Sequence, residues 1–459
     1  MTVKRFSALA LDEPALVLGR ALYPLERRGL VIGAGSVLPE IKFTLPPITI
    51  DAEHEQEICA QYRDMISRVC RRAVELQQGA IVVEFELLPQ MTFEPRWGGT
   101  ITEILREELD SAASSQGMRS LLRVTPVDVR ETKRPPLKRR GAEYESVLES
   151  FRVCARAGAD LLSIESVGGK EVTDTALMES DIRGIVFGAG ILGTSDVRFL
   201  WEQICSIARQ TNTVPAGDTA CGIGNTAMVL ADRLYIPKVF AAVVRVITAV
   251  RSLAAYESGA VGPGKDCAYE NAYLKAITGY PMSFEGKSAA GAHLSSVGNI
   301  AGAYADLWSN ESIQNVQLLS APAPVVATEQ LIYDCRLFNA ALRSGKELQL
   351  REWLVDSDAR LDPQAYIFRP EIVVAVAKEI VEAQSPFLRS LAAARRTVEL
   401  LWKGSDSGMV ALSAREKKWL DKIEKELGTI PEDRELFVAG ERDRWQAVVD
   451  FGEYDLAEI

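Results

Sequence analysis

Apolar and polar positions between residues 79 and 320 alternate in blocks that predict strands followed by helices. Short apolar runs rich in β-branched residues are typical of strands, and longer stretches with a period near 3.6 are typical of helices. Helices are predicted, for example, over Ile101–Ala113 and Tyr144–Ala157. The predicted strands are Ala80–Leu87, Leu121–Thr125, Asp160–Glu165, Thr213–Asp218, Ala260–Lys265, Pro281–Glu285 and Asn315–Leu319. Such alternation favours parallel strands joined by crossover helices.

The pattern therefore predicts a protein of the α/β class. About seven strand–helix units over about 250 residues match a closed (β/α)8 barrel, the TIM barrel. A doubly wound open sheet is the alternative fold, because the order of the strands cannot be read from one sequence. In both folds, the carboxyl ends of the strands are the expected place for a functional site.

The segments on either side of the barrel have different patterns. Residues 1–50 contain prolines and short extended runs such as Leu30–Ile32 and Glu40–Leu45, which predict an N-terminal arm laid over the barrel. Residues 51–320 form the predicted barrel, which begins with a charged helix over His54–Leu76. Residues 321–459 predict a helical C-terminal extension with helices over Glu371–Glu382, Phe387–Leu401 and Arg415–Leu427. Ser413 and Glu416 predict the start of the last helix, and Gly428 predicts its end.

Composition excludes several classes of protein. Of the 459 residues, 47% are hydrophobic and 25% are charged, which is typical of a folded globular protein rather than a disordered one. The net charge of −11 disfavours binding to nucleic acid or to an anionic membrane surface. The apolar run Val239–Val250 is shorter than the about 20 residues of a membrane span, and the amino terminus lacks a secretory pattern. We therefore expect a cytoplasmic protein that contacts neither nucleic acid nor membrane.

Two glycine motifs and the two histidines add little chemistry. The run Val31–Leu38 resembles a dinucleotide-binding turn but lacks the third glycine, and Gly286–Ser288 resembles the end of a phosphate-binding loop without its first glycine. His54 lies among acidic residues and is interpreted as a solvated helix residue. For His293, a role behind the site and a structural buried role both stay open.

Three potential metal ligands stand at or just after predicted strand ends. They are Glu165 after the run Leu161–Ile164, Cys221 in the segment Pro215–Gly222, and Cys267 in the segment Val261–Cys267. Strand ends that are distant in sequence converge at the carboxyl face of a barrel. One carboxylate and two thiolates are a plausible set for a catalytic zinc site with an open fourth position. Taken one at a time, however, each cysteine is more often a small buried apolar residue than a metal ligand.

Longer runs around these residues resemble a known family. The segments Gly217–Ala231, Gly259–Glu270, Leu274–Pro281, Phe284–Ala290 and Leu307–Ser312 closely resemble the methanol:corrinoid methyltransferase subunit family called MtaB. The resemblance extends over most of the chain and is densest between about Asp160 and Ser320. It departs from the family pattern locally, at Gly224 and Gly264, which are not among the potential ligands.

The resemblance implies an activity and a set of partners. It implies a zinc-dependent (β/α)8 barrel that transfers the methyl group of methanol to the Co(I) corrinoid of a separate corrinoid protein. It places the family's ligands for one Zn²⁺ per chain on Glu165, Cys221 and Cys267. It further implies a homo-oligomer within a larger complex, and a downstream methyl acceptor that could be coenzyme M or a tetrahydropterin.

Residues beside the ligands are candidates for assisting the reaction. Methanol is a poor methyl donor, so a proton donor or hydrogen bonds to the departing oxygen are expected to assist the zinc. Asp218, Asn225 and Lys265 are the predicted catalytic residues, with Asp218 the first choice as a residue that either supports the ligands from behind or handles a proton. Gly217, Gly222 and Gly262 are predicted to let the corrinoid approach the backbone closely, although turn geometry explains them equally well. Asp266, Tyr269 and Glu270 are further neighbours of Cys267.

Three alternative functions stay open from the sequence. The first is a related methyltransferase that uses another O-methyl or N-methyl donor with the same zinc site and corrinoid partner. The second is a non-catalytic docking subunit, which loss of a ligand would favour, although all three ligands are present. The third is a barrel enzyme that does not need zinc.

Overall fold

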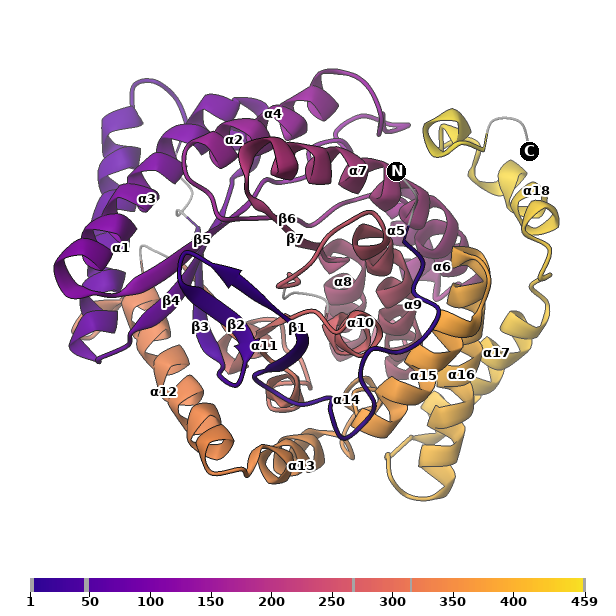
Figure 1. Cartoon of the computed structure of the whole chain (residues 1–459). Helices are drawn as coiled ribbons and strands as arrows, with labels where there is room; N and C mark the ends of the chain where they lie inside the picture. The colour runs from indigo at the N-terminus through magenta and orange to yellow at the C-terminus, as the bar shows by residue number, and fades with distance from the viewer. Residues whose placement is uncertain (1–3, 45–48, 266–268, 314–315, 457–459) are drawn as a thin grey trace.

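A curled parallel sheet forms the centre of the molecule, seen along its axis in Figure 1. The computed structural model describes residues 4–44, 49–265, 269–313 and 316–456. The sheet has seven strands in the order β7-β6-β5-β4-β3-β9-β8, and all the pairs are parallel. Its strands are β3 (Leu38–Thr44), β4 (Ala80–Glu86), β5 (Arg119–Thr125), β6 (Leu161–Ile164), β7 (Val214–Asp218), β8 (Ser283–Glu285) and β9 (Leu307–Ile313).

An irregular segment fills the remaining position between β7 and β8. The amides of Val261 and Gly262 each donate to a carbonyl of β7 at 2.9 Å, and the amide of Gly264 donates to the carbonyl of Pro281 at 3.1 Å. Pro263 lacks an amide hydrogen, so this segment cannot form a regular ladder. The predicted strand Ala260–Lys265 therefore occupies an eighth barrel position without strand geometry. The prediction of a (β/α)8 barrel is confirmed.

The predicted strand Asn315–Leu319 is wrong. The barrel strand in this region is β9, which ends at Ile313. Asn315 itself lies outside the described residues. The following residues form a separate two-stranded hairpin of β10 (Gln317–Leu318) and β11 (Ala321–Pro322). The polar sequence of β9 accounts for the error, because its inward-facing Ser309 contacts a polar barrel interior.

Amphipathic helices cover the outside of the barrel. In α3, for example, Ile101, Leu105 and Leu109 recur at four-residue spacing on the buried face, and the helix ends at Gly117 with a φ of 70°. The larger helices of this layer are α1 (Glu55–Glu75), α3 (Pro95–Gln116), α4 (Ala142–Arg156), α7 (Thr194–Thr211), α8 (Cys221–Asp232), α9 (Lys238–Glu257) and α12 (Ala323–Arg343). Shorter elements are α2 (Pro89–Phe93), α5 (Lys170–Glu179), α6 (Ile182–Phe187), the π-helical η1 (Gly188–Gly193), α10 (Asn271–Thr278), α11 (Lys287–Ala292) and η2 (Ile300–Ala303).

One helix of this layer, α9, is long and apolar enough to cross a membrane by length and composition. All of its most apolar window is buried inside the fold, where it packs against α7, α8 and α16. Its apolar surface is accounted for by these contacts within the chain.

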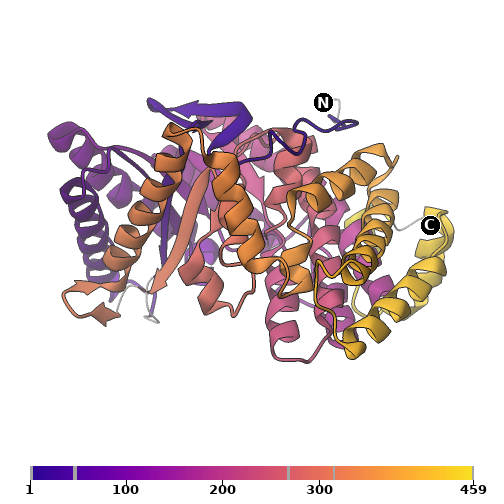
Figure 2. The same cartoon turned by 90° about the horizontal axis from the view of Figure 1, so that it is seen from below.

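A β-hairpin closes the amino end of the barrel. Strands β1 (Arg20–Arg27) and β2 (Leu30–Ala34) pair antiparallel and lie across one end of the barrel in Figure 2. Leu30 and Ile32 pack on the first inward-facing apolar residues of the strands, which are Leu38, Ala80, Val82, Leu121, Leu161, Val214, Ala216 and Leu307. This apolar layer leaves the carboxyl ends of the strands as the place for a site. Residues 1–50 thus contribute the barrel strand β3 as well as this hairpin. The predicted domain boundaries at residues 50 and 320 stay predictions.

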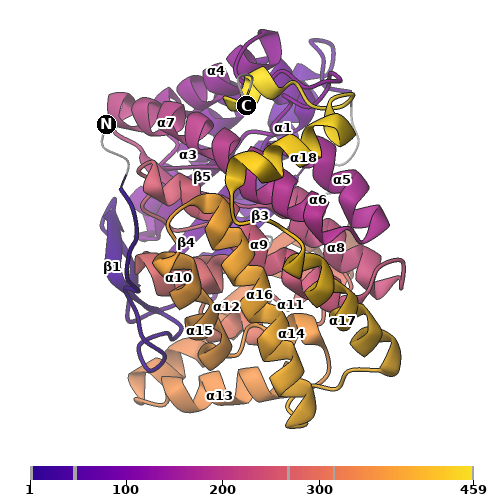
Figure 3. The ribbon, with the colours of Figure 1, turned by 90° about the vertical axis from the view of Figure 1, so that its right-hand side faces the viewer.

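The three predicted C-terminal helices are present beside the barrel (Figure 3), where two of them pack against α9 and the third packs against α10. The elements are α13 (Glu347–Asp358), α14 (Pro363–Tyr366), α15 (Pro370–Glu382), α16 (Pro386–Asp406), α17 (Ala414–Gly428), α18 (Arg434–Trp445) and η3 (Phe451–Tyr454). The Ser413 hydroxyl accepts the Glu416 amide at 3.2 Å, as predicted for the start of α17. The Glu416 carboxylate instead accepts the Val239 amide at 2.9 Å, so it caps α9 and ties the extension to the barrel.

Candidate active site

Above the apolar layer, the inward-facing side chains of the barrel are charged. Arg123 Nε donates to Glu40 Oε1 at 2.7 Å, and Lys265 Nζ lies 2.9 Å from Glu84 Oε1. These four side chains are at most 1% exposed. Charges buried in proteins are normally paired, and clusters of buried charged groups gather at functional sites. The carboxyl half of the barrel is therefore the candidate site.

Glu165 follows β6 directly and reaches the site from the barrel wall. Its backbone forms a parallel bridge with Val127, and its carboxylate Oε1 lies 3.4 Å from Lys265 Nζ. Its side chain is 24% exposed, so a ligand could reach it. Lys265 thus contacts two carboxylates, Glu84 and Glu165, from two separate strands.

Asp218, the predicted proton carrier, is fully buried at the end of β7. Its two carboxylate oxygens accept the amide of Ser166 at 3.1 Å, the hydroxyl of Ser166 at 2.5 Å and the indole N–H of Trp201 at 2.8 Å. Burial raises the pKa of Asp218, and the nearby Arg251 together with these hydrogen bonds opposes the rise. These contacts fix the backbone of the residue that follows Glu165.

Cys221 is the first residue of α8 and is half-buried. The positive end of the helix dipole favours a thiolate at this position. One turn further along, the side-chain amide of Asn225 donates to Cys221 Sγ at 3.3 Å. Cys221 therefore has both a helix terminus and a hydrogen-bond donor that stabilise negative charge on sulfur.

The third predicted ligand, Cys267, lies outside the described residues, as does its neighbour Asp266. Within the described ranges, no three cysteine, histidine, aspartate or glutamate side chains form a group that could hold a metal ion. Glu165 and Cys221 follow the paired strands β6 and β7. Glu165 and Cys221 therefore come from neighbouring positions around the barrel wall.

The structure explains two of the three predicted glycines by contacts within the chain. A Cβ atom on Gly217 would lie 2.6 Å from the Tyr256 hydroxyl, and one on Gly262 would lie 2.6 Å from the Pro281 carbonyl oxygen. Both glycines therefore allow the irregular segment to close the barrel. Gly222 is next to Cys221 in the first turn of α8, where a Cβ atom would lie 3.3 Å from Lys170 Cε.

The remaining candidates hold the frame of the site. The Glu270 carboxylate accepts the Thr219 hydroxyl at 3.1 Å and the Ala220 amide at 2.9 Å, which anchors the chain leading into α8. The Tyr269 hydroxyl donates to Glu285, and His293 Nδ1 lies 3.4 Å from the same carboxylate. His293 thus contacts an inward-facing residue of β8.

The family model of the methanol-cobalamin methyltransferase B subunit, MtaB, matches residues 3–455. The chain belongs to this family. The methanol–corrinoid protein co-methyltransferase of Methanosarcina barkeri (strain Fusaro / DSM 804) is 36% identical over 444 residues, which cover 95% of each chain. In the crystal structure of the methanol:cobalamin methyltransferase complex MtaBC from Methanosarcina barkeri, one chain is 35% identical with a TM-score of 0.94. That match covers 98% of this chain and 99% of the other.

As a member of the MtaB family, the chain is a methyltransferase with a TIM-barrel fold. The predicted resemblance and the predicted enzyme class are confirmed. The comparisons do not extend to zinc, to individual site residues or to the oligomeric state, which stay predictions.

Several charged residues of the barrel interior were not predicted from the sequence. Glu84 and Glu86 stand two positions apart in β4, and Lys42 faces the same interior from β3. Lys42 Nζ lies 3.6 Å from Glu86 Oε2. The signal was the pair of glutamates at strand spacing within an otherwise apolar run, because a period of two places both on one face.

The pKa of Glu86 predicts a pH dependence of stability. Burial raises this pKa to about 8; Lys42 and Lys265 oppose the rise, and Glu165 and Glu84 add to it. The folded pKa lies above the value of about 4.3 in an unfolded chain, so the contribution of Glu86 is greatest below pH 4.3 and is lost as the pH rises through 8. We expect the free energy of unfolding of the metal-free protein to fall between about pH 5 and pH 8.

The check is urea denaturation of the wild type and of Glu86→Gln across this pH range. The variant should show a weaker fall, because its side chain does not titrate. Equal pH dependence of the two proteins would contradict the raised pKa.

Proposed function

We propose that this chain activates methanol and transfers its methyl group to the Co(I) corrinoid of a partner corrinoid protein. The zinc ion in this proposal is held by Glu165, Cys221 and Cys267. The observation that carries the proposal is the position of Glu165 and Cys221 after neighbouring barrel strands, in a chain that belongs to the MtaB family. The M. barkeri relative named as a methanol–corrinoid protein co-methyltransferase supports the substrate and the partner.

The residues present fit a zinc ion by their chemistry. Carboxylate and thiolate are common zinc ligands, and three protein ligands leave room for a substrate oxygen. The Asn225 amide that donates to Cys221 Sγ is typical of the contacts that orient a ligand from behind. When bound, zinc would supply Lewis acidity toward the methanol oxygen.

In the proposed reaction, the C–O bond of methanol breaks and the methyl group passes to Co(I), which supplies the electron pair. The oxygen leaves as water after it takes up one proton. Glu86 is our candidate to hold this proton, because it lies two positions beyond Glu84 on the inward face of β4, 3.6 Å from Lys42 Nζ, where burial raises its pKa. We assign Asp218 a positioning role, since its carboxylate is already bonded to Ser166 and Trp201.

Lys265 balances charge in this scheme. Its ammonium lies between Glu84 and Glu165, so it limits the repulsion between the two carboxylates in the buried interior. Asn225 stabilises negative charge on Cys221 Sγ through its hydrogen bond to the sulfur. Both residues therefore keep anionic ligands in place rather than take part in bond breaking.

The test is the zinc content of the purified chain together with methyl transfer to reduced Co(I) cobalamin. Parallel reactions contain methanol, methylamine or a methoxylated aromatic compound. We expect about one zinc per chain and transfer from methanol alone. If the chain binds zinc but transfers a methyl group only from another donor, that donor would replace methanol as the proposed substrate. Absence of zinc would overturn the proposal.

A further inference from the structure

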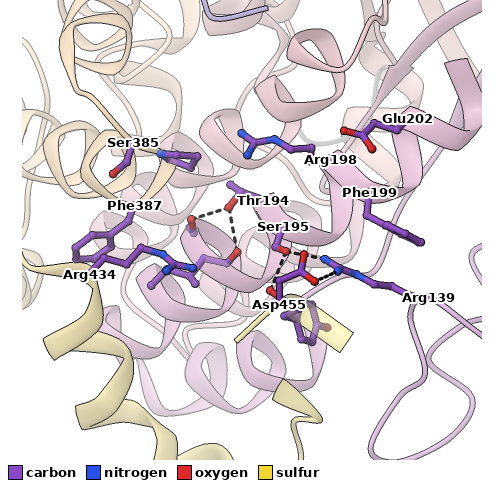
Figure 4. Close-up of a pocket in the computed structure, with 14 residues that line it drawn as sticks. Arg139, Thr194, Ser195, Arg198, Phe199, Glu202, Ser385, Phe387, Arg434 and Asp455 are labelled. Carbon is purple, nitrogen blue, oxygen red and sulfur yellow. Dashed lines mark hydrogen bonds and ion pairs between the residues drawn. The ribbon is translucent and has the colours of Figure 1, made fainter. Parts of the chain in front are cut away.

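The segment Asp450–Asp455, here called the C-terminal strap, lies against the loops that follow β5 and β6. It contains the short helix η3. Figure 4 shows Arg139 joined to Asp455 and to Ser195 along the wall of a cavity of about 370 Å³. Arg139 belongs to the loop after β5, and Ser195 lies at the start of α7. The strap therefore connects the far end of the chain with the rim of the barrel.

Glu453 binds the loop after β5 through its carboxylate. One oxygen accepts the backbone amides of Lys138 and Arg139 at 2.9 and 2.8 Å, and the other accepts Arg140 Nε at 2.6 Å. The Glu453 side chain is 4% exposed. A buried carboxylate that satisfies two backbone amides holds the backbone conformation of three successive residues.

Tyr454 is 1% exposed and binds the loop after β6 through its hydroxyl. The hydroxyl accepts the Gly169 amide at 3.2 Å and donates to the Glu171 carboxylate. Its backbone carbonyl accepts the Ser195 hydroxyl at 3.1 Å. Tyr454 thus satisfies a buried amide of the loop that begins at Glu165.

At Gly168 and Gly169 this loop has no side chains that could hold its conformation. A Cβ atom on Gly168 would lie 2.3 Å from Asp196 Cβ, and one on Gly169 would lie 1.9 Å from the Gly188 carbonyl oxygen. Gly169 also has a φ of 78°. Two adjacent glycines cost more conformational entropy to order than other residues do, so external contacts are needed.

The contacts of the loop divide between its two ends. Asp218 holds Ser166 at the start, and the amide of Val167 donates to Asp128 at 3.0 Å. At the other end, the Tyr454 hydroxyl is the side-chain partner of the Gly169 amide. Loss of that hydroxyl would leave a buried amide and a buried carboxylate without their shared partner.

We propose that Tyr454 of the C-terminal strap is a positioning residue that orders the loop of residues 166–170 and so fixes Glu165 for metal binding. The metal part of this inference rests on the proposed function. The ordering of the loop does not, because every contact that carries it is within the metal-free chain. The strap thereby makes the C-terminal extension a part of the site.

The experiment compares the full-length wild type with Tyr454→Phe, which removes only the hydroxyl. Tyr333→Phe is the matched control, because its hydroxyl also donates to a glutamate, Glu329, but on the surface of α12. Hydrogen exchange of the metal-free proteins is followed in a peptide that covers residues 165–172 and in a reference peptide from β4. Zinc affinity is measured separately by competition with a chromophoric chelator.

We expect Tyr454→Phe to accelerate exchange in residues 165–172 at least about tenfold, with the β4 peptide and the Tyr333→Phe control unchanged. Its zinc dissociation constant should rise about tenfold, the lower range for residues that support a ligand. Unchanged exchange in the loop, or equal acceleration in both peptides, would overturn the positioning role. If the wild type binds no zinc, the proposed function fails, and the exchange result still decides whether the strap orders the loop.

Discussion

Substitution of Cys221 by alanine is expected to remove zinc from the chain and to reduce methyl transfer by more than about 100-fold. Loss of a residue that only orients a metal ligand already costs up to about 100-fold in metal affinity or activity, and loss of the ligand itself should cost more. The proposed thiolate lies at the first position of α8, and the Asn225 amide donates to its sulfur. A methyl side chain at this position keeps the helix but supplies no ligand. The measurement is zinc per chain and the rate of cobalamin methylation from methanol in the same preparations.

Cys59→Ala is the matched control for this substitution. Cys59 is also a partly exposed cysteine near the start of a helix, but it lies on α1 outside the barrel, and burial raises the pKa of its thiol. We expect it to keep both zinc and activity. Retention of zinc and of methyl transfer by Cys221→Ala would exclude this thiol as a ligand.

The sequence predicts the fold where the hydrophobic pattern and the geometry agree. Strands β5, β6 and β7 carry apolar residues on both faces near their amino ends, because one face packs on helices and the other on the apolar layer inside the barrel. Helix ends were also predictable, as the hydrogen bond between Ser413 and the Glu416 amide shows.

Prediction fails where the barrel interior becomes polar. Strand β9 begins with the buried apolar Leu307 and Trp308 and continues with the buried polar residues Ser309 and Asn310. In a single sequence, such a polar run resembles a loop. Strand β3 has charged residues at Glu40 and Lys42 for the same reason, and its place between β4 and β9 depends on closure of the whole sheet. Only the three-dimensional arrangement shows that Glu40 faces Arg123 and that Lys42 faces Glu86.

Part of the candidate site could likewise be predicted from the sequence, and part could not. Residue type and position after a strand are local signals, so Glu165 and Cys221 could be predicted as candidates from the sequence and its resemblance. The contact of Lys265 with Glu84, and that of Tyr454 with Gly169, join segments far apart in the chain. Such pairs follow from the closure of the barrel and from the path of the C-terminal extension, and no spacing in the sequence encodes them.

The Lys265→Met substitution is expected to lower the free energy of unfolding of the metal-free protein by about 3–5 kcal/mol, the cost of leaving a buried charge without its partner. Lys265 and Glu84 are both fully buried at 2.9 Å, and Glu165 shares the same ammonium. Methionine fills most of the volume of lysine, so the loss arises mainly from the charge. Urea denaturation in the presence of a chelator measures it.

Two further variants separate this charge effect from a packing effect. Lys287→Met removes a half-exposed lysine that pairs with Asp334 at 3.0 Å, and it should change stability by at most about 1 kcal/mol. Adding Glu84→Gln to Lys265→Met should recover part of the lost stability, because glutamine is neutral and can still accept the Thr125 hydroxyl that bonds to Glu84 at 2.6 Å. A double variant as unstable as Lys265→Met alone would show that the lysine acts through packing, and charge balance in the barrel interior would then need another source.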